Sequence, residues 1–148
     1  MDASGFVFGP AASYSDHLFF EFGTRVAAST TPIGTTPLPA ADFATIVDLR
    51  RRLELGLPNV NSLAAARLYR VEPLAEGEYQ FLADWPSVAS SSPFAIRFSR
   101  DDAAATIASS LLSAVTSSAF AHDWQEAPGR LMYLDARYLP KIFYKFAE

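Results

Sequence analysis

Residues 99–121 read S-R-D-D-A-A-A-T-I-A-S-S-L-L-S-A-V-T-S-S-A-F-A, and this stretch decides how the rest of the chain can be arranged. Its apolar residues recur at the three- and four-residue spacing of a helix that buries one face. They are Ala104, Ile107, Ala108, Leu111, Leu112, Val115 and Ala119. Ser99 is a good N-cap residue, and Asp101 and Asp102 place negative charge at the positive end of the helix dipole. We therefore predict one long helix over residues 99–121.

The opposite face of this helix carries hydroxyl groups, with no charge anywhere from Ala103 to Ala121. Its members are Thr106, Ser109, Ser110, Ser113, Thr116 and Ser117. A solvated helix face normally carries charged residues, so one interpretation is that a second surface packs against it. The other is that an Ala- and Ser-rich helix simply faces water. The hydroxyl content is too high for a membrane span on a transfer scale, so we expect no span.

Strand patterns lie on both sides of the long helix. Residues 78–85 alternate, with Tyr79, Phe81 and Ala83 facing one way, and Phe94, Ile96 and Phe98 form the inner face of the next strand. Further strands are predicted at 17–26, 66–73 and 130–139. Residues 75–77 form a hairpin turn between two of these strands.

A second helix is predicted to begin at Pro39 or Ala40 and to end near Gly56. Its last turns contain Arg50, Arg51 and Arg52. One interpretation is that these side chains complement the helix dipole and pair with Asp48 and Glu54. The other is a patch that binds an anion or nucleic acid.

The order of these elements predicts a single α+β domain over residues 1–148. We expect an antiparallel or mixed sheet of about five to six strands with two helices on one face, in a ferredoxin-like element order with an extra strand. Residues 1–15 are predicted to form an extended arm, residues 27–39 a Thr/Pro-rich loop, and residues 140–148 an aromatic tail that forms a short helix or another strand.

Composition narrows the classes of function. The chain of 148 residues has no cysteine, which excludes disulfides, thiolate metal sites and cysteine nucleophiles. Its net charge is −4 and its pI is about 5.1, which opposes binding of a nucleic-acid duplex over most of the surface. The sequence shows no signal peptide, so we expect synthesis in the cytoplasm, or location in a virion if the chain is viral.

Residues for catalysis are few. His17 follows Asp16 and His122 precedes Asp123, but neighbouring side chains usually point apart, and no nucleophile elbow or glycine-rich phosphate loop accompanies them. His122 is more simply explained as a partner of the helix C-terminus. We expect a protein that is not an enzyme and has no metal or cofactor.

The leading hypothesis is a structural or interaction subunit that self-assembles, such as a capsid or tail component of a virion, or a subunit of a larger complex. The predicted partners are further copies of itself or other proteins. The interface residues we expect are Phe6, Phe8, Ser109, Ser113, Thr116, Ser117, Phe143, Tyr144 and Phe146.

Two alternatives remain. The first is a small-molecule-binding or enzymatic domain whose aromatic-lined pocket lies between sheet and helices, with His17, His122 or Asp135 pointing inward. The second is an RNA- or anion-binding module that uses Arg50, Arg51 and Arg52.

Overall fold

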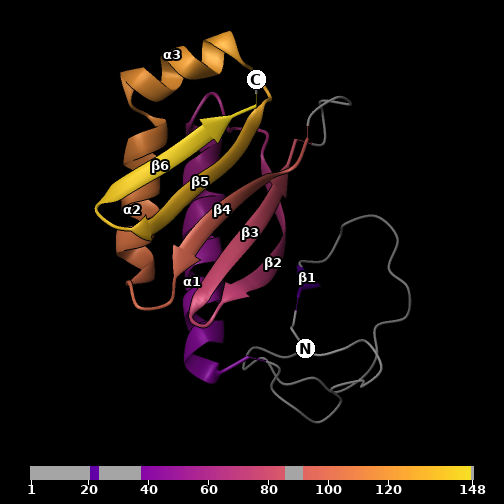
Figure 1. Ribbon diagram of the computed structural model, residues 1–148, viewed down its shortest axis with the longest axis vertical. Helices are drawn as coiled ribbons and strands as arrows, with labels where there is room; N and C mark the ends of the chain where they lie inside the picture. Colours follow the sequence, from indigo (N-terminus) through magenta and orange to yellow (C-terminus); the bar gives the residue numbers. More distant parts are fainter. Residues whose placement is uncertain (1–20, 24–37, 86–91, 148) are drawn as a thin grey trace.

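The computed structural model describes residues 21–23, 38–85 and 92–147, which form a six-stranded sheet with its strands in sequence order (Figure 1). The strands are β1 (Glu21–Phe22), β2 (Arg67–Ala75), β3 (Glu78–Asp84), β4 (Phe94–Ser99), β5 (Leu131–Tyr138) and β6 (Lys141–Phe146). The helices are α1 (Ala40–Gly56), α2 (Ala104–Val115) and α3 (Ser118–Glu126), with a short 3-10 turn, η1 (Leu57–Asn59), after α1. The α+β class and the mixed sheet are confirmed.

The pairing of the strands is antiparallel except at two places. β1 runs parallel to β2, and β4 runs parallel to β5, because a helix connects each of these pairs. The two parallel pairs are direct neighbours in the sheet. The elements therefore follow one another along the chain in the predicted order. The sheet differs from a split βαβ unit, because there a further strand lies between the two parallel strands.

One face of the sheet is covered by the helices. Figure 1 shows α1 running behind the strands, α2 beside it, and α3 crossing near the end of β6. The side chains that fill this layer are fully buried and mostly aromatic or branched. They include Phe81, Phe94, Phe98, Phe120, Ile46, Leu49, Leu53, Ile96, Ile107 and Leu111.

The first helix has the predicted bounds, but Gly56 has a different role from the one expected. Its backbone is right-handed helical, at φ −90° and ψ −43°, so it does not terminate the helix in the left-handed conformation. A Cβ atom at Gly56 would lie 2.5 Å from a methyl carbon of Leu112. The absence of a side chain at Gly56 thus lets α1 and α2 pack closely, and any larger residue would require the Leu112 side chain to move.

The predicted long helix over 99–121 is wrong. Ser99 ends β4, its Oγ accepts a hydrogen bond from the Asp101 amide at 3.2 Å, and α2 begins five residues later without a side-chain cap. The helical stretch then breaks after Val115 and continues as α3, at an angle of 60°. Ser117 provides the reason, because its Oγ accepts from the Phe120 amide at 3.2 Å and so starts a new helix.

The bend changes which side chains are buried. Ala119, which the helical spacing placed on the buried stripe, is exposed, whereas Phe120 is completely buried. Within the described ranges, no single helix is long and apolar enough to cross a membrane, and only the bent pair of α2 and α3 reaches the required length and composition.

Candidate interaction surface

The last strand, β6, forms one edge of the sheet and pairs only with β5 within the described residues. This is the aromatic tail of the sequence. Its side chains alternate along the strand. Lys141, Phe143 and Lys145 are exposed, and Ile142, Tyr144 and Phe146 are half-buried.

The half-buried side of β6 is occupied by contacts within the chain. The ring centroids of Tyr144 and Phe146 lie 5.1 and 5.6 Å from that of Phe120. The Tyr144 hydroxyl donates to a carboxylate oxygen of Asp123 at 2.8 Å. Burial, together with this bond and the nearby negative charge, raises the pKa of Tyr144. Of the three tail aromatics predicted at an interface, only Phe143 keeps about half of its surface exposed, at 51%.

The hydroxyl face of α2 lies beside β6. Together they form an open hollow of about 500 Å³. Its lining consists of Ser109, Ser110, Ser113, Ala114, Ser117, Pro140 and Ile142. Two segments that the sequence predicted separately as interfaces, the helix face and the tail, are thus neighbours in the fold.

Some hydroxyls of this face are satisfied locally. Ser109 Oγ donates to the Thr106 carbonyl at 3.0 Å, and Thr116 Oγ1 donates to the Leu112 carbonyl at 2.8 Å. Thr116 does not line the hollow. The hydroxyl face therefore offers a neighbour a surface of small, uncharged side chains.

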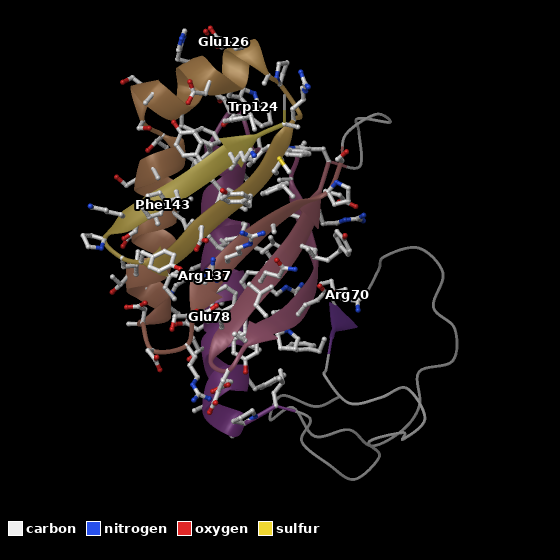
Figure 2. The ribbon with its side chains drawn as sticks, in the orientation of Figure 1. Arg70, Glu78, Trp124, Glu126, Arg137 and Phe143 are labelled. Carbon is white, nitrogen blue, oxygen red and sulfur yellow. The ribbon has the colours of Figure 1, made fainter. Side chains whose placement is uncertain are left out.

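On the opposite face of the sheet, Arg137 is the centre of an ion cluster. Its guanidinium donates to both carboxylate oxygens of Asp135, at 2.9 and 2.7 Å, and to Glu78 at 2.8 Å. Figure 2 shows Arg137 beside Glu78, with Phe143 on the same side of the sheet. These two carboxylates raise the pKa of Arg137.

Asp135 is only 5% exposed. Burial acts to raise the pKa of its carboxyl, but the hydrogen bonds from Arg137 and the positive charges of Arg137 and Arg97 together lower it. Sequence reasoning missed this cluster, although an acid and a base two residues apart on one strand lie on the same face.

A second polar cluster fastens α1 to the sheet. Asp42, in the first turn of α1, is buried and accepts from the Tyr79 hydroxyl and from Arg100 Nη1 at 3.2 Å. The hydrogen bond and charge of Asp42 raise the pKa of Arg100. The cluster joins three separate segments of the chain, so we assign it a structural role.

The three arginines of α1 do not form a free cationic patch. Arg50 pairs with Glu54 at 2.7 Å and Arg52 pairs with Asp48 at 3.0 Å, which are the pairs predicted from the sequence. Arg51 is exposed. The anion-binding interpretation of this run stays a prediction.

The remaining candidates do not meet in one pocket. His122 lies within α3, not after a helix, and its exposed ring is 3.4 Å from Glu126. Asp135 is on the face away from the helices and is held by Arg137. No group of three or more metal-ligating side chains occurs in the ranges that the structure describes.

Three predicted residues, Phe6, Phe8 and His17, lie outside the described residues, as do the arm over 1–15 and all but the last two residues of the 27–39 loop.

Comparison with known proteins gives no relative of this chain: no family, no curated protein and no solved structure matches it.

Proposed function

We propose that this protein is a non-catalytic subunit that self-assembles by joining β6 to the β6 strand of a second copy. The observation that supports the proposal is the position of β6, an edge strand next to the uncharged hollow of α2. An edge strand presents unpaired backbone donors and acceptors, which a second strand can pair with.

A two-fold axis perpendicular to the sheet would extend it through both copies. Because α2 contacts β5 and β6 on the covered face, the two α2 helices would then meet beneath the junction. Strands are spaced about 4.8 Å apart, and the axis lies midway between the two β6 strands. A helix under the midline of β5 and β6 is therefore about 5 Å from the axis, and the two α2 helices are about 10 Å apart. This distance is close to the 8–10 Å at which helices pack, and Ser and Ala are small enough to permit it.

The lysines of β6 favour one register of this pairing. If the two-fold axis passes through Tyr144, Lys145 lies opposite Phe143 of the second copy. Lys141 then lies at the end of the paired β6 strands, where no lysine of the second copy faces it. With the axis at Phe143, Lys141 would lie opposite Lys145, which is unfavourable because like charges would face each other. We therefore propose the register centred on Tyr144.

The assembly state of the wild-type protein is the first test. Sedimentation velocity should show a species of twice the 16.1 kDa chain mass at protein concentrations of about 10–200 μM. A monomer throughout this range would contradict the proposal.

A matched pair of variants locates the interface. Ser113→Glu places a charge in the hollow, where two copies would bring two carboxylates together, and should weaken the dimer at least about tenfold. Ala105→Glu places the same charge on an exposed position of the same helix, outside the hollow, and should leave the dimer unchanged. Equal effects of the two substitutions would place the interface elsewhere. An acidic extended peptide that binds the wild-type monomer instead would identify a different partner for β6.

A capsid or tail component, or a subunit of a larger complex, would each use such a junction. The identity of the assembly remains a prediction.

A further inference from the structure

Arg97 is a cation on the open face of the sheet. The carboxylate opposite it, that of Asp135, is hydrogen-bonded to Arg137 instead. Arg97 lies on β4 directly opposite Asp135 of β5. Both carboxylate oxygens of Asp135 accept from the Arg137 guanidinium, and one also accepts from the Arg137 amide at 3.1 Å. Arg97 makes no hydrogen bond or ion pair with the described residues, and its Nε is buried without an acceptor.

An aromatic ring and a second cation lie beside this guanidinium. The Arg97 Cζ is 4.5 Å from the ring centroid of Tyr133 on β5. Tyr133 in turn lies opposite Lys145 of β6. Lys145 is exposed, and none of the ion pairs among the described residues includes it. Arg97 and Lys145 thus lie on the two strands that flank the strand of Tyr133, and the Asp135 carboxylate acts on Arg97 through its charge without a hydrogen bond.

We propose that Arg97 and Lys145 bind a small phosphate-bearing anion across Tyr133. A planar guanidinium can bind two oxygens of a phosphate, and a lysine adds a point charge to a third. The stacking on Tyr133 holds the Arg97 head in place, so less side-chain entropy is lost on binding.

The surroundings favour a small anion over a polyanion. Glu72 and Glu78 lie on neighbouring strands of the same face, where they are held by Arg70 at 2.9 Å and Arg137 at 2.8 Å. The chain as a whole carries a net charge of −4. A long nucleic acid would have to pass these carboxylates, whereas one phosphate group would not. This inference does not require the dimer, because all three residues belong to one copy and the exposed Lys145 side chain lies on the open face, whereas the proposed junction uses the backbone of β6.

Titration of the full chain tests the site. Inorganic phosphate and glycerol 3-phosphate would each be added at pH 7.5 and constant ionic strength, with binding followed by amide chemical shifts and calorimetry. We expect saturable binding at about millimolar concentration, with the shifts concentrated on β4, β5 and β6. Tighter binding of glycerol 3-phosphate would identify a phosphate monoester as the ligand, and equal binding would identify the free ion.

Charge-matched variants separate this site from general electrostatics. Arg97→Gln should weaken phosphate binding at least about tenfold, because the guanidinium can bind two phosphate oxygens. Lys145→Gln should weaken it about threefold, because an exposed lysine adds only a point charge. Arg51→Gln removes the same charge from an exposed position on α1 and should have no effect. Lys145 is exposed, so its variant reports on binding even if Arg97→Gln perturbs the fold.

Three results would overturn the inference. They are the absence of saturation, an equal loss of binding in Arg51→Gln, and stronger binding of a single-stranded oligonucleotide that Arg97→Gln leaves unchanged.

Discussion

The two faces of the sheet are stabilised by different forces, although neighbouring residues of the same strands form them. On β4, Phe98 faces the helices and is completely buried, and Arg97 faces the other way and is half-buried. The covered face is held by the burial of apolar surface. The open face is held by charge pairs whose strength depends on pH and salt. The stability that the open face contributes should therefore vary with pH and salt, whereas that of the covered face should not.

The largest difference between the faces should appear when a phenylalanine is removed from the covered side. Phe98→Ala deletes a fully buried ring that stacks on Phe81 at 4.9 Å. We expect a loss of about 3–5 kcal/mol in the free energy of unfolding, from lost burial and the cavity left behind. Chemical denaturation at constant protein concentration measures it. A loss below about 1 kcal/mol would show that the covered face is not the stabilising one.

A smaller and pH-dependent loss is expected from the ion cluster on the open face. Asp135→Asn leaves Arg137 with Glu78 alone, and should cost about 1–3 kcal/mol at pH 7. The folded chain lowers the pKa of Asp135, so its contribution is present above the unfolded value near pH 3.9 and is lost as the pH falls through the folded value. The difference between wild type and variant should therefore be constant from pH 7 to about pH 4 and shrink below it.

Denaturation at several pH values measures this difference. Glu126→Gln is the control, because its carboxylate is 69% exposed and pairs only with His122 within the described residues. A deficit in Asp135→Asn that grows as the pH falls would contradict the assigned direction of the shift.

The smallest effect on stability should come from the same Phe-to-Ala change on the open face. Phe143 is 51% exposed, and among the described rings it meets Tyr138 alone, edge-on, with centroids 6.1 Å apart. Phe143→Ala should change the free energy of unfolding by no more than about 0.5 kcal/mol when folded monomer and unfolded chain are compared. A cost near that of Phe98→Ala would show that the two faces are equally packed.

Local patterns in the sequence predicted most of the elements. The alternation of residues 78–85 placed Tyr79, Phe81 and Ala83 on the covered face, and the structure confirms it. Pro39 and Gly56 marked the ends of α1. The bend between α2 and α3 was missed because the capping tendency of Ser117 competes with a helical pattern that continues through it, and the buried position of Phe120 decides the outcome.

The candidate site was predicted only in part. The hydroxyl face of the helix and the tail were both singled out, but their meeting at one hollow depends on β6 pairing with β5. Tyr144 and Phe146 could not be distinguished from Phe143 by composition. Their partner, Phe120, is more than twenty residues away in the sequence.

The sequence by itself determined which residues of each strand share a face, because side chains alternate with a period of two whatever the strand pairs with. Only the tertiary structure decided the order of the strands and the partners across them. Arg137 meets Glu78 from 59 residues away and also binds Asp135, and no described residue forms a hydrogen bond or ion pair with Arg97. Such pairings depend on which strands become neighbours, and that is set by the packing of the whole core rather than by any local stretch.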